Sequence, residues 1–267
     1  MARIECLSDV GLFVKDLKKA RQFYTRKIGL KVRSSMPKYG YIALGTTLRG
    51  EDASLNPWAP EPSWGQELYE KGMKEIGTVT GIGFRTGSLD KTVAAFKKAG
   101  VSIEVSKDPT GDPFGRFQDL DGNTSFVFQP RRPKVRRGGL LRFDFVTVVA
   151  RDLERTHEFF TKGLGLRGKR TSEGFAEYRV SPKGTAVTPF TPNREMYEDP
   201  ADYDADMAHI GESTSIGFEV SDIYALQEKL MARGVRFSKK ATKETWGGIQ
   251  AKFLDPDDNE YSLVQME

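Results

Sequence analysis

Two stretches of this sequence recur about 136 residues apart, and this duplication constrains the fold more than any other feature. The stretch that starts at Asp9, DVGLFVKDLKKARQFYTRKIGLKV, returns at Phe145 as FVTVVARDLERTHEFFTKGLGLRG. The stretch that starts at Phe117, FQDLDGNTSFVFQ, returns at Phe253 as FLDPDDNEYSLVQ. The two matches bracket a duplicated unit of roughly 130 residues, which predicts two similar domains in tandem.

The length of 267 residues fits two domains of ordinary size, each long enough to bury its own core. We expect the first domain at 1–130 and the second at 140–267. The stretch RRPKVRRGG at 131–139 combines one proline with two glycines and is typical of an inter-domain linker.

Within each half, a pattern of one strand, one helix and three strands occurs twice. The first half predicts helices from Asp16 to Gly29 and from Ser88 to Gly100, and strands at 5–14, 31–36, 41–46, 53–58, 80–86, 101–106, 115–120 and 124–129. The second half repeats the pattern, with helices over 152–165 and 222–234. Four βαβββ modules therefore account for nearly the whole chain and predict an α+β fold. We expect the connectors at about 60–77 and 192–213 to be loops, the second of them acidic.

Composition argues against several classes of function. No apolar run approaches the ~20 residues of a membrane span, so no membrane association is expected. The N-terminus lacks the pattern of an export signal and the single cysteine, Cys6, forbids an internal disulfide, which together favour a cytoplasmic location. The basic linker explains most of the net charge of +4, and no basic face interleaved with aromatics predicts nucleic-acid binding.

The repeated pattern V-x-D-L-x-x-(A/T)-x-x-F-(Y/F)-x-x-x-(I/L)-G-L and its closing D-x-D-x-N-x-x-x-x-x-Q resemble the vicinal oxygen chelate superfamily. That superfamily includes glyoxalase I, the bleomycin-resistance proteins and the extradiol dioxygenases. The resemblance implies that the paired modules form two glyoxalase-like, half-open cup domains, each with a pocket inside its cup. It implies no single activity, because many functions share this fold.

The resemblance also implies where a divalent metal would be bound, since most enzymes of the superfamily hold one between His, Gln and Glu side chains. The corresponding positions form four pairs, one residue from each copy of the repeat. The pairs are Asp9 and Phe145, Phe126 and Ser262, Gly81 and Ser215, and Ser54 or Asn56 with Ala186 or Thr188. One carboxylate and no imidazole do not make the usual site. We therefore predict no metal ligands and no cofactor.

Asp9 and His209 are the candidate catalytic residues. Asp9 lies on a strand face expected to line the cup, where a carboxylate needs a partner or solvent, and His209 follows the acidic connector. The alternative interpretations are a solvated strand-end carboxylate and a loop histidine. Aromatic or polar side chains at the expected cup positions give the candidate ligand-binding residues Asn56, Trp58, Trp64, Phe126, Phe145, Thr188, Ser215, Trp246 and Ser262.

Three functional hypotheses follow. The leading one is a metal-free protein that binds a small organic molecule in one or both cups. The alternative is a lyase, isomerase or ring-cleavage dioxygenase that is metal-independent or has an atypical site. The third is a structural module whose cups are filled by side chains such as Phe126 and Phe145. Because the fused halves replace the dimer that single-domain relatives form, we expect a monomer or a homodimer.

Overall fold

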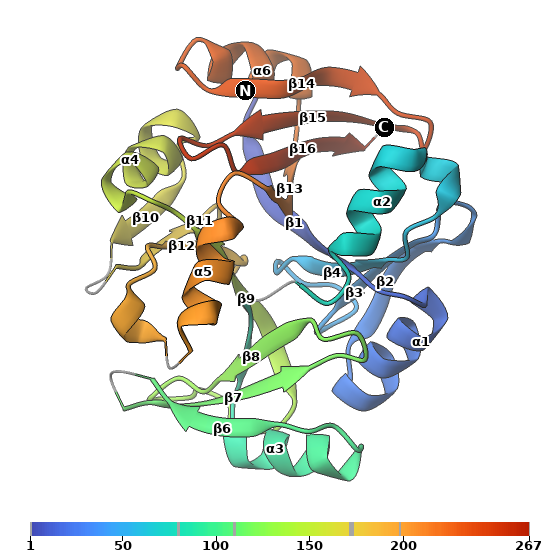
Figure 1. The fold of residues 1–267 in the computed structure, drawn as a ribbon, viewed down its shortest axis with the longest axis vertical. Coiled ribbons are helices and arrows are strands. Elements are labelled where there is room, and N and C mark those ends of the chain that lie inside the picture. Colours follow the sequence, from blue (N-terminus) through green and yellow to red (C-terminus); the bar gives the residue numbers. More distant parts are fainter. Residues whose placement is uncertain (1, 79–80, 109–110, 171–173, 198, 267) are drawn as a thin grey trace. The chain divides into compact units, whose positions relative to one another are not determined.

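Four βαβββ modules make up the fold, as the sequence predicts (Figure 1). The computed structural model describes residues 2–78, 81–108, 111–170, 174–197 and 199–266. The first module contains β1 (Ile4–Phe13), α1 (Leu17–Gln22), η1 (Phe23–Ile28), β2 (Lys31–Met36), η2 (Pro37–Tyr39), β3 (Tyr41–Gly45) and β4 (Ser54–Trp58). The second contains β5 (Ile82–Thr86), α3 (Leu89–Lys98), β6 (Glu104–Lys107), β7 (Pro113–Gln118) and β8 (Thr124–Phe128). Thr80, expected at the start of this module, lies outside the described residues.

The second half repeats the same order of elements. The third module contains β9 (Leu140–Val149), α4 (Leu153–Glu158), η4 (Phe159–Gly163), β10 (Arg167–Arg170), β11 (Ala176–Arg179) and β12 (Ala186–Phe190). The fourth contains β13 (Ser213–Val220), α6 (Ile223–Met231), β14 (Arg236–Lys243), β15 (Gly248–Leu254) and β16 (Glu260–Met266).

Side-chain caps start all four module helices. Asp16 accepts a hydrogen bond from the N–H of Lys19 at 3.0 Å, and Ser88, Asp152 and Asp222 cap their helices in the same way. Gly29 ends the first helix in the left-handed conformation, with φ of 90°. These observations confirm the helix boundaries that the sequence predicts.

The second half of the first and third module helices differs from a regular α-helix. Residues 23–28 (η1) and 159–163 (η4) form π-helical turns. In η1 the wider turn lets two consecutive aromatic side chains, Phe23 and Tyr24, both become buried, with their rings edge to face at 5.3 Å. The sequence pattern does not reveal such turns, because their apolar spacing is also compatible with an α-helix.

The connectors between modules are not plain loops, which corrects the expectation from the sequence. The first contains η3 (Pro62–Trp64) and α2 (Gln66–Lys74), and the second contains η5 (Arg194–Met196) and α5 (Pro200–Ala208). The acidic run forms a helix because Asp199 caps it and Pro200 occupies its first turn, where a missing N–H costs nothing.

The strands form two eight-stranded mixed sheets, in the orders β14-β15-β16-β13-β1-β4-β3-β2 and β10-β11-β12-β9-β5-β8-β7-β6. The chain divides into two compact units, Asp9–Phe145 and Met1–Ser8 with Val146–Glu267, which we call the N-terminal and C-terminal units. Strands β1 and β9 each pass from one unit into the other. Within the C-terminal unit, Ser8 Oγ donates to the carbonyl of Gly217 at 3.1 Å. The boundaries 1–130, 131–139 and 140–267 stay a prediction.

Each closing turn contains an aspartate that organises the backbone; Asp255 is buried and Asp119 is partly exposed. Asp119 accepts N–H groups from Asp121, Gly122 and Asn123 at 2.9 to 3.0 Å. In the second copy, Asp255 accepts N–H groups from Asp257 and Asn259 at 2.8 and 3.0 Å. Asp119 and Asp255 therefore have a structural role in the closing turns.

Candidate functional site

One face of the first module in the N-terminal unit gathers polar and aromatic side chains. The parallel pairing of β1 with β4 places Asp9 opposite Ser54, Gly11 opposite Asn56, and Phe13 opposite Trp58. Because side chains alternate along a strand, these residues share one face, while Leu55 on the other face is fully buried in the core. We call Asp9, Tyr41, Asn56, Trp58 and Trp64 the polar–aromatic cluster.

Tyr41 on β3 joins Asp9 and Asn56 in this cluster. Burial raises the pKa of the Tyr41 phenol, the charge of Asp9 raises it further, and hydrogen bonding with Asn56 lowers it. The phenol therefore stays protonated at neutral pH beside a carboxylate. This arrangement places a proton donor and an acceptor group on the same face of the sheet.

Asn56 has an unsatisfied polar atom. The residue is only 2% exposed, and its Oδ1 is buried without a hydrogen bond from any described residue. Leaving a buried carbonyl oxygen unpaired costs about 1–3 kcal/mol. When no protein group reaches such an atom, its usual hydrogen-bond partner is a water or a bound molecule. An N–H or O–H group of a bound molecule would satisfy it.

An aromatic chain continues the cluster on one side. The ring of Trp58 lies 5.6 Å from that of Tyr41 and 6.3 Å from that of Trp64, and Trp64 lies 6.3 Å from Phe13. All four rings are partly exposed. Partly exposed, mutually packed rings offer a rigid apolar surface for a ligand at low entropic cost.

Near Ser54 at the start of β4, the guanidinium of Arg33 donates hydrogen bonds to several oxygen atoms. Its guanidinium donates to Asp52 Oδ1 at 2.5 Å, to the Asp52 carbonyl at 2.6 Å and to the Thr47 carbonyl at 2.9 Å. Asp52 also accepts from Thr46 Oγ1 at 2.9 Å and from the N–H of Phe143 at 2.8 Å. Because this ion pair is buried and already satisfied, we assign Arg33 a structural role.

The second module of the same unit, together with Phe145 on β9, presents an apolar face instead. Phe126 and Phe145 belong to a group of four contacting rings that also includes Phe114 and Phe128, with centroids 5.3 to 6.2 Å apart. Gly83 is required beneath this group, since a Cβ at that position would lie 2.3 Å from the Phe145 ring. All four rings are partly exposed, so they line a face of the sheet without being part of the core.

The residues at the superfamily's metal positions do not fit a divalent metal. Phe126 and Phe145 have no lone pair to donate, and Asn56, Ser215 and Ser262 are weak metal ligands. Asp9 supplies the single carboxylate at these positions. Within the described part of the chain, no group of three or more His, Cys, Asp or Glu side chains could hold a metal ion.

The remaining candidates lie in the C-terminal unit and are engaged locally. Thr188 Oγ1 donates to the carbonyl of Val146 at 3.0 Å, and Ser262 on β16 pairs with Gly217. Ser215 has φ of 54° at a register shift in β13. The ring of Trp246 lies against Gly248, where a Cβ would lie 1.8 Å from it.

His209 ends helix α5 and its Nδ1 lies 2.9 Å from Glu212 Oε2, three residues on. Both side chains are exposed. This local pairing accounts for the histidine, and its catalytic role stays a prediction.

Tyr41 is the residue that sequence reasoning missed. It was visible only as the first residue of an expected strand, with no motif around it. In the antiparallel pairing of β3 with β4, Leu44 lies opposite Leu55, so Tyr41 falls opposite Trp58. The strand register could have identified it, but register cannot be read from one sequence.

Replacing Asp9 with asparagine should lower the Tyr41 phenol pKa towards its ordinary value, because the substitution removes a negative charge that opposes formation of the tyrosinate. An ultraviolet titration of tyrosinate absorbance, with the same titration of Tyr41→Phe subtracted to isolate the residue, measures this change. An unchanged Tyr41 titration would show that the two groups do not interact.

The four βαβββ modules define the class of protein by its fold, and the comparisons with known proteins agree with this class. The model of the Glyoxalase/Bleomycin resistance protein/Dioxygenase superfamily matches residues 7–125 and 142–263. The chain belongs to this superfamily, with one family domain in each half. No curated protein sequence matches the chain.

Solved structures with similar folds cover nearly the whole chain. Glyoxalase I from Zea mays has 17% sequence identity and a TM-score of 0.67, with coverage of 99% of this chain and 92% of that chain. A candidate dioxygenase from Bacillus subtilis has 12% identity and a TM-score of 0.61, with coverage of 98% and 86%. At these identities the likeness establishes the fold alone. In the described part of the chain, no helix is long and apolar enough to cross a membrane.

Proposed function

We propose that this two-domain superfamily member binds a small organic molecule at the polar–aromatic cluster of its N-terminal unit, without a divalent metal. The ligand presents an N–H or O–H donor to Asn56 Oδ1 and Asp9, and an apolar or planar surface to Trp58 and Trp64. Specificity comes from the few fixed polar groups, and most of the affinity comes from the aromatic surface.

The observation that carries this proposal is the buried, unpaired Oδ1 of Asn56. A group of this kind discriminates strongly, because a ligand without a matching donor leaves it unpaired. The neighbouring carboxylate and phenol supply a second acceptor and a donor on the same face. The aromatic rings of Trp58 and Trp64 lie next to them and remain partly exposed.

The absence of a metal is the part of the proposal that separates it from the metal-dependent enzymes of the superfamily. Protein purified without chelators should contain well under one equivalent of Fe, Mn, Zn, Ni or Co per chain, because the donor set offers one carboxylate and no imidazole. Elemental analysis by mass spectrometry measures this content. A stoichiometric, tightly bound metal would overturn the metal-free proposal.

A metal-independent lyase or isomerase remains the alternative function. Asp9 would act as its base and the protonated Tyr41 as its acid, since the two groups interact on one face of the sheet. The cytoplasmic location and the monomeric or homodimeric state also remain proposals from the sequence.

A further inference from the structure

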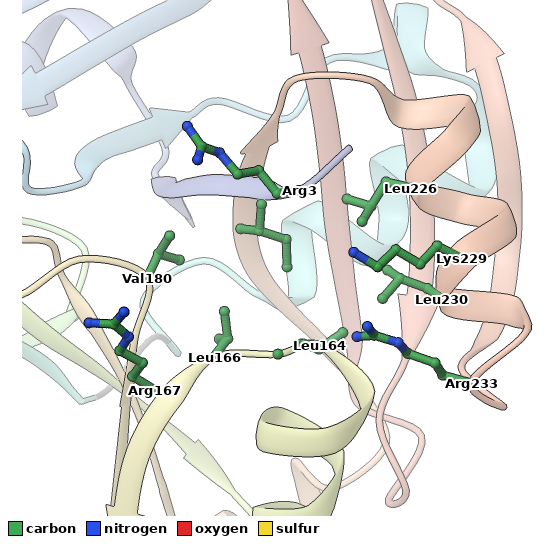
Figure 2. A pocket seen from close by; sticks show the side chains of 11 residues that line it. Arg3, Leu164, Leu166, Arg167, Val180, Leu226, Lys229, Leu230 and Arg233 are labelled. Carbon is green, nitrogen blue, oxygen red and sulfur yellow. The ribbon is translucent and has the colours of Figure 1, made fainter. Parts of the chain in front are cut away.

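The C-terminal unit contains a cavity that lies outside the polar–aromatic cluster. Its volume is about 310 Å³, at the lower end of the range for small-molecule pockets, which is about 300–1,000 Å³. Four separate segments meet there: the start of β1, the turn between η4 and β10, the residue after β11, and helix α6 (Figure 2).

The floor of this cavity is apolar. Leu166, Leu226 and Leu230 line it, and they are 7%, 2% and 0% exposed. Ile4 and Leu164 complete the apolar lining and are also buried. A hydrocarbon group of a ligand would remove this surface from water and gain about 25 cal/mol for each Å² of apolar area buried.

The rim of the cavity is cationic. Arg3, Arg167, Lys229 and Arg233 line it, no Asp or Glu is among the described lining residues, and all four cations are exposed. Figure 2 shows Lys229 and Arg233 extending from α6 and the chain just after it towards the middle of the cavity, whereas the guanidinium groups of Arg3 and Arg167 point away from it. Like charges held around one opening raise the local potential and attract an anion.

Other interactions account for only part of this charge. Arg233 donates to the carbonyl of Gly163 at 3.1 Å, and Arg3 Nε lies 4.0 Å from Oε1 of the exposed Glu5. Within the described residues, Arg167 and Lys229 have no ion-pair partner. Lys229 lies in the last turn of α6, where a cation interacts favourably with the helix dipole. Arg167 begins strand β10, so the helix dipole does not explain its charge.

A second cavity serves as an internal comparison. It lies in the N-terminal unit and has the same volume of about 310 Å³, but its lining includes Glu104 and Asp119 as well as Lys27 and Arg116. Charge is therefore balanced there. The excess of positive charge is a property of the first cavity and does not follow from the fold that the two halves share.

We infer that the cavity of the C-terminal unit binds a small amphiphilic anion. The carboxylate or phosphate group of this anion lies between Lys229 and Arg233 at the rim, and its hydrocarbon part lies against the leucines of the floor. Charge-assisted hydrogen bonds hold the head group, and apolar burial holds the tail. This site is independent of the ligand proposed for the polar–aromatic cluster.

Isothermal titration of the full-length chain with octanoate and with octyl phosphate tests the inference. We expect at least one of them to bind, and which one binds identifies the head group. The neutral octanol should bind at least about tenfold more weakly, since it makes no charge-assisted hydrogen bond. Lys229→Gln combined with Arg233→Gln should weaken anion binding at least about tenfold, and added salt should weaken it in the wild type.

Lys97→Gln combined with Lys98→Gln is the matched control, because it removes two exposed cations from the last turn of α3 and touches neither cavity. This control should bind the anion as the wild type does. The inference is overturned if neither anion binds, if octanol binds equally well, or if both double variants lose affinity alike. Because Lys229 and Arg233 are exposed, circular dichroism should show both variants folded.

Discussion

Replacing Asp255 with alanine is expected to lower the free energy of unfolding by about 3–5 kcal/mol. Asp255 is 2% exposed and accepts hydrogen bonds from the N–H groups of Asp257 and Asn259. It also accepts from Asn259 Nδ2 at 2.9 Å and from Tyr261 Oη at 3.2 Å. Alanine removes the acceptor of all four hydrogen bonds in a buried turn. Asn259 Nδ2 keeps its hydrogen bond to the Val149 carbonyl at 3.0 Å, but the other three donors lose the partner that Asp255 gives them.

Denaturant unfolding followed by circular dichroism measures the change as a shift of the midpoint. Asp258→Asn is the matched control in the same turn. Asp258 is exposed and has φ of 67°, which asparagine also tolerates, so the control should change stability by less than about 1 kcal/mol. If Asp255→Ala is as mild as the control, the buried network does not stabilise the turn.

The two copies build this network with tyrosines from different elements. In the first copy, Asp119 accepts from the phenol of Tyr24 on η1 at 2.8 Å. In the second, Asp255 accepts from Tyr261 on β16. Burial raises the pKa of both phenols well above its ordinary value, and the aspartate charge adds to the effect. The aspartate is repeated in the sequence, but its partner is not, so the repeat alone predicts half of the network.

Trp58→Ala is expected to weaken binding of a ligand at the polar–aromatic cluster by about 2 kcal/mol, which is roughly thirtyfold. Trp58 links Tyr41 to Trp64 through ring contacts of 5.6 and 6.3 Å, so its removal takes away the centre of the aromatic surface. Thermal-shift titration of the variant against the wild type measures the loss, because a ligand that binds only the native state raises its stability.

Trp246→Ala is the matched tryptophan control. Trp246 is also a candidate ligand-binding residue from the sequence, but its ring covers Gly248 in the C-terminal unit. This variant should leave binding unchanged within about twofold, since tryptophans outside a binding site contribute little to its affinity. Loss of binding in Trp246→Ala with none in Trp58→Ala would move the site away from the N-terminal unit.

The sequence predicts the scaffold well because the scaffold depends on local chemistry. The caps at Asp16, Ser88, Asp152 and Asp222 and the left-handed Gly29 each act within a few residues, so one sequence is enough to find them. Helices α2 and α5 were missed because both are short, α2 is mostly polar, and α5 has a weak apolar pattern and begins at a proline.

The candidate site is less visible in the sequence because it depends on register. Asp9, Asn56 and Trp58 were found as single positions, but only strand pairing brings Asp9 near Tyr41. Phe126 and Phe145 lie together because Gly83 leaves space under the Phe145 ring. The cationic cavity combines four segments far apart in the sequence, and no local pattern indicates it.

The most direct test of ligand binding without a metal is a thermal-shift screen of aromatic, thiol-containing and cationic metabolites, carried out in the presence of a chelator. We expect at least one compound to raise the melting temperature of the wild type in a concentration-dependent way. The same compound should fail to stabilise Asn56→Ala, which removes the unpaired acceptor. If compounds stabilise the protein only after a divalent metal is added, or stabilise Asn56→Ala as strongly as the wild type, the account is contradicted.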